Sequence, residues 1–135
     1  LTVKTVSGTG VIVPVAAKMV LYSDGTNISS GPITKGYYTI PGGYTAVSGD
    51  QLLVNTSGGG LGVPVTVTLP ATPSVGDEVT IIDSGNAFGS NNLTVGRNGS
   101  NILGNASNLT VSTNGAAFTL VYVNATRGWA YKDNI

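Results

Sequence analysis

Apolar and polar residues alternate in short runs along most of the chain, a pattern that predicts β-strands. In Val63–Leu69 the odd-numbered positions are all apolar, and Thr66 and Thr68 fall on the opposite face. In Glu78–Asp83, Val79 and Ile81 point inward between polar neighbours. No window carries a sustained apolar repeat at the helical spacing of three and four residues. The pattern therefore predicts an all-β chain of many short strands joined by turns.

The expected strands share this alternation and have turn residues at their ends. They are Leu1–Val6, Val11–Val15, Lys18–Tyr22, Tyr37–Ile40, Leu52–Asn55, Val63–Leu69, Glu78–Asp83, Leu93–Val95, Leu109–Ser112, Phe118–Val123 and Trp129–Lys132. The strand Phe118–Val123 is apolar on both faces, which indicates a central strand or one beneath an intersubunit contact. The stretch Gly36–Asp50 is less regular and more aromatic, so we expect an insertion or an exposed loop there.

Length and composition favour one domain built as a sandwich. The chain has 135 residues, 20 of them Gly, with abundant Val and Thr for strands and Asn and Ser for turns. We expect a single all-β domain over residues 1–135, a sandwich or jelly-roll-like fold of roughly ten short strands. The Gly-rich stretch Asn55–Gly62 reads as a loop and is the one candidate for an internal boundary.

The charge content points to a surface that packs against other protein. Only 9% of residues are charged, six basic and six acidic, with a formal net charge of zero. A soluble monomer normally carries more charge, so we expect a homo-oligomer or contact with a larger particle. Six scattered basic residues do not form the patch that nucleic acid requires.

The residue types that the chain lacks exclude several kinds of catalytic and metal-binding site. The chain has no Cys and no His, which excludes disulfides, thiolate metal sites and the commonest general base. We expect no cofactor and no metal. No apolar run is long enough for a membrane span, and no signal peptide is visible. The sequence does not begin with Met, so we expect it to be a piece of a longer gene product.

The acidic residues favour turns over catalysis. Asp77 and Glu78 are adjacent, so on a strand they face opposite ways and form no carboxylate pair. Asp24 and Asp83 stand where turns begin, and there an Asp side chain caps its own backbone. We therefore expect a non-enzymatic protein. A pair of carboxylates distant in sequence, as in a glycosidase, remains the alternative.

Aromatic residues are the candidates for a glycan-contact surface, because rings stack on the apolar faces of sugars. The candidates are Tyr37, Tyr38, Tyr44 and Trp129. For Trp129 the pattern favours half-buried packing, whereas for the tyrosines the two interpretations are balanced. Seven Asn-x-Ser/Thr sequons are also present, and we interpret them as incidental to turns, with glycosylation left open.

One phrase occurs twice. Asn-Leu-Thr-Val followed two residues later by Asn-Gly begins at Asn92 and at Asn108, an offset of 108 − 92 = 16 residues. Leu and Val point into a core, and Asn-Gly supplies the positive φ of a tight turn. We expect structural roles at Asn98, Gly99, Asn114 and Gly115. A β-solenoid rung would give a similar offset. Two copies of the phrase do not distinguish a solenoid from a simple succession of strands and turns.

Arg97 is the only charged residue in the stretch Asn91–Gly115, which contains both copies of the phrase. We expect it to be structural and to reach either a carbonyl of its own turn or a neighbouring subunit.

The second half of the chain resembles a segment of bacteriophage tail-fibre and related virion proteins. The matching residues are Leu69, Pro70, Pro73, Gly76, Asp77, Val79, Ile81, Asp83, Gly85, Phe88, Asn92, Leu93, Val95, Arg97, Asn98, Gly99, Ile102, Gly104, Phe118, Leu120, Val121, Tyr122, Gly128 and Trp129. The opening, through Tyr-Ser-Asp-Gly-Thr-Asn, is similar to another segment of these proteins. The resemblance implies an all-β, often trimeric virion module with no catalytic residues.

These observations lead to three functional hypotheses. The first is a tail-fibre or tail-associated structural domain, located on the virion and helping it adsorb to the bacterial host, with other virion proteins and a host surface glycan as partners. The alternative is a capsid decoration (cement) protein that stabilises the head. The third is a carbohydrate depolymerase domain. We place the tail ahead of the head surface.

Overall fold

The computed structural model describes residues 36–133 in full and, within residues 1–35, the backbone of six short strands. Asp24 lies outside the described residues. The chain divides into two compact units, Leu1–Tyr37 and Tyr38–Ile135. The expectation of a single domain over residues 1–135 stays a prediction.

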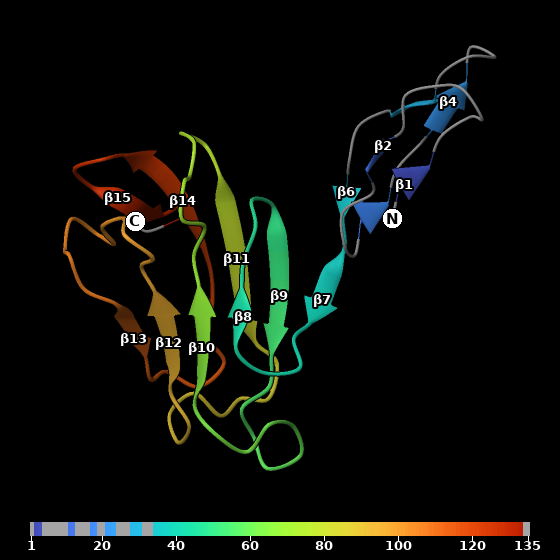
Figure 1. Cartoon of the computed structure of the whole chain (residues 1–135). Helices are drawn as coiled ribbons and strands as arrows, with labels where there is room; N and C mark the ends of the chain where they lie inside the picture. Colours follow the sequence, from blue (N-terminus) through green and yellow to red (C-terminus); the bar gives the residue numbers. More distant parts are fainter. Residues whose placement is uncertain are drawn as a thin grey trace. The chain divides into compact units, whose positions relative to one another are not determined.

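The described strands of the first unit form three two-stranded antiparallel pairs (Figure 1). The pairs are β1 (Thr2–Val3) with β2 (Val11–Ile12), β3 (Ala17–Lys18) with β6 (Thr34–Lys35), and β4 (Leu21–Ser23) with β5 (Ile28–Ser30). The expected strands Leu1–Val6 and Val11–Val15 contain β1 and β2. The single strand expected at Lys18–Tyr22 overlaps both β3 and β4, and the sequence pattern misses β5 and β6.

Nine strands form two packed sheets in the described residues that follow (Figure 1). The five-stranded sheet has the order β15 (Gly128–Tyr131), β14 (Ala117–Asn124), β11 (Glu78–Asp83), β9 (Asp50–Val54) and β7 (Tyr37–Thr39). The four-stranded sheet has the order β13 (Leu109–Val111), β12 (Leu93–Gly96), β10 (Val65–Thr68) and β8 (Tyr44–Thr45). No helix occurs among these residues. The all-β, sandwich-like prediction is confirmed.

The chain winds between the two sheets. From β7 to β12, successive strands alternate between the five-stranded and the four-stranded sheet. Strand β9 pairs in parallel with β11, and β10 pairs in parallel with both β8 and β12. The register places Val65 beside Leu93, so one turn of this coil takes 93 − 65 = 28 residues. A jelly roll is antiparallel, so these parallel pairs identify a sandwich with coiled connections.

The three last strands close the coil with antiparallel pairs. Strand β13 pairs with β12 at the edge of the four-stranded sheet. Strand β14 lies between β11 and β15, so the strand that is apolar on both faces is indeed an internal one. Its pairing with β15 contains an irregularity between Tyr122 and Asn124.

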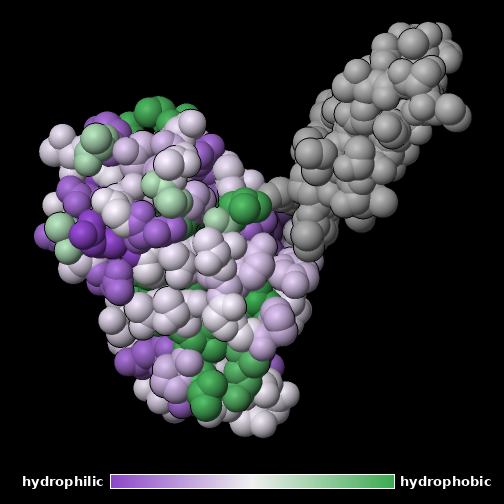
Figure 2. All heavy atoms as spheres, in the orientation of Figure 1, coloured by the Kyte–Doolittle hydropathy of each residue, from purple (hydrophilic) through white to green (hydrophobic). Residues whose placement is uncertain are grey.

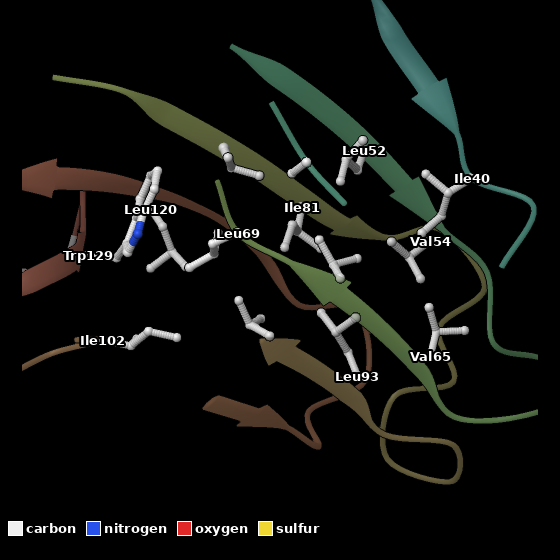
Figure 3. Close-up of a cluster of buried hydrophobic side chains, with 14 of the residues drawn as sticks. Ile40, Leu52, Val54, Val65, Leu69, Ile81, Leu93, Ile102, Leu120 and Trp129 are labelled. Atoms are coloured by element: carbon white, nitrogen blue, oxygen red, sulfur yellow. The ribbon is translucent and has the colours of Figure 1, made fainter. Parts of the chain in front are cut away.

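The hydrophobic core fills the space between the sheets (Figure 3). Leu52, Val54 and Ile81 point inward from the five-stranded sheet, and Val65 and Leu93 point inward from the four-stranded sheet. The burial pattern of β9 and β11 alternates residue by residue, as a strand with one core face requires. Each fully buried aliphatic side chain contributes about 1.5–3 kcal/mol, so this layer is the main source of stability.

The expectation of an insertion or exposed loop at Gly36–Asp50 is wrong. The stretch contains β7, β8 and the first residue of β9, and Ile40 and Ala46 are buried in the core. Strand β8 has only two residues, too few to show alternation, and it forms because β10 supplies a parallel partner. The stretch Asn55–Gly62 belongs to the loop between β9 and β10, which carries the chain from one sheet to the other.

Candidate interaction surface

Two of the candidate tyrosines pack on the core. Tyr44, in β8, pairs with Val67 and therefore faces the same side as the core residues of β10. Its ring lies 5.8 Å from that of Tyr38, centroid to centroid. Both side chains are half-buried, so only part of each ring is open to a ligand.

The hydroxyl of Tyr44 is tied to an acidic group. It donates a hydrogen bond to Oδ2 of Asp50 at 3.2 Å, and the backbone N–H of Val47 donates to the same oxygen at 2.8 Å. Burial raises the pKa of Tyr44, and the negative charge of Asp50 raises it further. Asp50 is 7% exposed, so this pair links β8, the following turn and β9.

Tyr37 is the exposed member of the predicted aromatic set. It lies in β7 with 56% of its surface accessible. It is also the last residue of the first unit, whereas Tyr38 begins the second. Tyr37 therefore stays a candidate contact residue by exposure alone.

Trp129 does not lie on the surface. It is fully buried in β15 (Figure 3). Its ring packs edge to face on that of Tyr122, with 5.6 Å between centroids. Its Nε1 atom is buried and has no hydrogen-bond partner among the described residues. Including Trp129 among the glycan contacts is wrong, and the packing interpretation that its pattern favours is the correct one.

Asp83 is a buried turn residue at the end of β11. Its carboxylate accepts hydrogen bonds from the backbone N–H groups of Ala87 (2.9 Å), Phe88 (3.1 Å) and Gly115 (3.0 Å). The first two bonds close the turn that follows β11, and the third fastens a second turn to it. Only 6% of Asp83 is exposed, so the arrangement serves structure, as the sequence predicts.

The predicted turn at Arg97–Gly99 has the expected geometry. Asn98 and Gly99 have φ angles of 47° and 94°. The Arg97 guanidinium donates to the carbonyl oxygens of Gly99 at 3.2 Å and Ser100 at 3.4 Å. Of the two roles expected for Arg97, binding the carbonyls of its own turn is observed. Asn98 also donates from Nδ2 to the carbonyl of Leu69 at 2.8 Å.

The second Asn-Gly pair also holds a turn. Gly115 has a φ of 71°, and Asn114 accepts a hydrogen bond on Oδ1 from the N–H of Gly89 at 2.7 Å. The two copies of the repeated phrase are themselves neighbouring antiparallel strands, with Leu93 opposite Val111 and Val95 opposite Leu109. Rungs of a solenoid stack in parallel, so the offset of 16 residues does not come from a solenoid rung.

Several sequon asparagines use their side chains to hold turns. Oδ1 of Asn55 accepts from the N–H of Ser57 at 3.0 Å, and Oδ1 of Asn124 accepts from the N–H of Arg127 at 2.7 Å. Oδ1 of Asn108 accepts from the N–H of Arg97 at 3.0 Å. These contacts support the interpretation of the sequons as turn residues.

A pair of turns at one end of the sandwich was not predicted as a unit. Ser48 donates from Oγ to Asp77 Oδ1 at 2.8 Å, and the N–H of Gly49 donates to the carbonyl of Glu78 at 2.7 Å. Val47 and Val75, one in each turn, are 52% and 75% exposed. No sequence signal links these turns, because they are brought together by the parallel pairing of β9 and β11.

The most regular exposed feature is the outer surface of the four-stranded sheet. Every outward position in its strands is a threonine or a glycine, and we call this surface the Thr face. It consists of Thr45 in β8, Thr66 and Thr68 in β10, Thr94 and Gly96 in β12, and Thr110 in β13. Three of the threonines are exposed, two are half-buried, and Gly96 is buried beside Thr68.

The threonines of the Thr face stand in rows across the strands. Thr66 pairs with Thr94, and Thr94 pairs with Thr110, so three hydroxyl groups line up over β10, β12 and β13. Thr68 pairs with Thr45 on one side and with Gly96 on the other, which forms a second row. Strands lie about 4.8 Å apart and alternate residues about 6.7 Å apart, so the hydroxyl groups form a regular grid.

Metal and membrane features are absent from the part of the chain that the structure describes. No group of three or more acidic, His or Cys side chains is placed to hold a metal ion there. The same residues form no helix that is both long and apolar enough to cross a membrane. Figure 2 shows the described surface as mainly pale and purple, with hydrophobic residues in small groups.

Comparison with known proteins gives distant structural likeness and no family. No family model matches the chain, and no curated protein matches it. A solved structure described as "Structure of a chaperone-substrate complex" contains a chain that is 19% identical to this one, with a TM-score of 0.41. The match covers 70% of this chain and 14% of that chain. The likeness is thus confined to a small part of a much longer polypeptide.

Proposed function

We propose that the chain is a non-enzymatic structural module of a bacteriophage virion, part of a tail fibre or tail-associated protein that helps the particle attach to the bacterial surface. The single observation that carries the proposal is the Thr face. It is a rigid, uncharged and open surface on a sandwich, and a surface of this kind suits attachment without bond chemistry.

The residues that carry the resemblance to virion proteins support the same proposal, because they form the structural framework of the domain. Asp83 holds two turns, Phe88 and Trp129 are fully buried, and Gly128 adopts a positive φ of 72°. Because these residues build the framework, we assign binding to other residues, on exposed surfaces. The Thr face and the exposed Tyr37 are such surfaces.

Oligomer formation is a second part of the proposal. We propose a homo-oligomer, for which the low charge content is the motivation: 9% of residues are charged, with no net charge. We propose a trimer in particular because the virion modules that the chain resembles are often trimeric. Closed oligomers cover edge strands that would otherwise pair with other chains. Sedimentation equilibrium of the purified chain measures this directly, and a monomer at all concentrations would contradict it.

The test of function is adsorption. Fluorescently labelled chain is mixed with bacterial strains that the parent particle infects and with strains that it does not, and bound label is counted per cell. We expect binding to the first group and competition with particle adsorption. Absence of binding to every susceptible strain would refute the attachment role.

Antibody labelling of the intact particle separates the remaining hypotheses. Label at the tail tip or fibres supports the proposal, whereas label in many copies over the head would identify a decoration protein. Release of reducing sugar ends from host polysaccharide by the purified chain would identify a depolymerase instead.

A further inference from the structure

We propose that the Thr face binds an uncharged polysaccharide that lies across strands β10, β12 and β13. This inference rests on the proposed attachment function and names its ligand class and its site. The site is the row Thr66–Thr94–Thr110, with Thr45 and Thr68 beside it.

The chemistry of the row matches that of a sugar chain. Each threonine presents a hydroxyl group, which both donates and accepts a hydrogen bond, and a methyl group. A pyranose ring likewise presents hydroxyl groups at its edge and C–H groups on its face. The three threonines are spaced about 4.8 Å apart across the strands, so a single sugar chain that runs across β10, β12 and β13 can contact all three hydroxyl groups.

The absence of charge on the Thr face selects a neutral ligand. All outward positions of β8, β10, β12 and β13 are threonine or glycine. Arg97, which follows β12, has its guanidinium on the carbonyls of Gly99 and Ser100. An anionic polysaccharide would therefore lose its hydration here without gaining a partner of opposite charge.

The Thr face is preorganised for binding. Threonine is branched at Cβ and has few side-chain rotamers, and the ladder hydrogen bonds of β10 with β12 and of β12 with β13 hold the row in register. Little side-chain entropy is lost when a rigid row of this kind meets its ligand.

A second copy of the chain fits the Thr face less well than a glycan does. The centres of stable protein interfaces are apolar and rich in aromatic residues. No aromatic or large aliphatic side chain points outward from these strands. The outer side of the five-stranded sheet, where Leu53 and Ile82 pair, offers more apolar surface to another copy.

The experiment is affinity electrophoresis of the full chain in native gels that contain dextran, galactomannan or the anionic polysaccharide alginate. We expect at least one of the two neutral polymers to slow the wild-type chain and alginate to have no effect. The test variant is Thr66→Val/Thr94→Val/Thr110→Val, because valine keeps the shape and the β-propensity of threonine and removes only the hydroxyl.

The expected loss is about 2- to 10-fold in affinity per hydroxyl group, so the triple variant should migrate as it does in a gel without polysaccharide. Thr119→Val is the matched control. Thr119 lies on the five-stranded sheet, where it is hydrogen-bonded to Thr80 at 2.8 Å, and its replacement should leave retardation unchanged. Circular dichroism and thermal unfolding establish that all variants are folded.

Three results would overturn the inference: no retardation of the wild-type chain in either neutral gel, equal retardation of the triple variant, or retardation by alginate alone. A change of sedimentation coefficient in the triple variant, without a change in gel retardation, would also overturn it in favour of self-association. The cell-binding assay separates the two proposals. If the triple variant binds susceptible cells as the wild type does, the Thr face is not the site and the attachment function stands.

Discussion

The carboxylate of Asp83 accepts a hydrogen bond at 3.0 Å from the backbone N–H of Gly115, which lies 32 residues further along the chain. The same carboxylate oxygen also accepts from Ala87 and Phe88 in the turn directly after β11. One buried acidic side chain thus joins the turn that leaves the five-stranded sheet to the turn that returns to it. The two Asn-Gly turns therefore differ, because only this one is fastened by a distant carboxylate.

Asp83→Asn should destabilise the chain by on the order of 2–4 kcal/mol, because the three hydrogen bonds to Oδ2 lose the charge of the carboxylate, and the NH₂ group that replaces Oδ1 faces the N–H of Ala87, which donates to Oδ1 at 3.2 Å. Urea unfolding, followed by circular dichroism, measures the free energy of unfolding. The control is Asp77→Asn. Asp77 accepts from Ser74 and Ser48 at an exposed turn, where we expect a loss of about 1 kcal/mol. Equal losses in the two variants would contradict the structural role assigned to Asp83.

Gly128→Ala should destabilise the chain by about 3 kcal/mol or more. Gly128 has a φ of 72°, and a Cβ atom at this position would overlap the backbone of Asn101. The cost adds the strain of a positive φ to that of overpacking. Gly76→Ala is the matched control, because Gly76 has a φ of 92° and open space around a Cβ; it should lose about 1–2 kcal/mol. The difference between the two free energies of unfolding isolates the steric contact with Asn101.

Local alternation predicts the longer strands and fails for the shortest. Strands β9, β10 and β11 each bury alternate residues, so their sequences carry the evidence of their position. Strand β8 consists of Tyr44 and Thr45 and owes its existence to its parallel partner β10. A pairing between segments distant in sequence leaves no local pattern, so that stretch was expected to be a loop.

The candidate interaction surface, too, can be predicted from the sequence only in part. The sequence places a threonine outward in each copy of the repeated phrase, at Thr94 and Thr110, and in β10 at Thr66. It does not show that these three stand side by side, because register depends on how the strands pair. For Trp129, the sequence favours half-buried packing and does not show that the ring is fully buried. The structure buries the ring completely and joins Trp129 by a backbone bridge to Ile102, a residue of a separate segment.

Trp129 fluorescence should report on the core. The chain contains a single Trp, and it is fully buried against Tyr122. We expect emission at short wavelength and weak quenching by acrylamide in the folded chain, with a red shift and strong quenching in concentrated urea. The unfolded chain serves as the internal control. Strong quenching under native conditions would mean that the ring is accessible and that the contact between β15 and the loop after β12 is not formed.

Tyr44 should make stability depend on pH in the alkaline range. Burial and the charge of Asp50 raise the pKa of its phenol above the usual value of about 10. The folded state therefore holds the phenol proton more tightly than the unfolded state does. The resulting stabilisation is fully present below the unfolded pKa and is lost as pH rises through the raised, folded pKa. The free energy of unfolding should fall above about pH 10.

Tyr44→Phe removes this group and should show a shallower alkaline decline, together with a loss of about 1 kcal/mol near neutral pH from the missing hydrogen bond to Asp50. Urea unfolding of both chains from about pH 8 to pH 11 measures the effect, and the difference between the two curves cancels the titration of all other groups. Tyr37→Phe, at an exposed position, controls for the loss of a phenol as such. Parallel curves for wild type and Tyr44→Phe would show that the phenol of Tyr44 titrates alike in the folded and unfolded states, and the Tyr44–Asp50 contact would then not persist in solution.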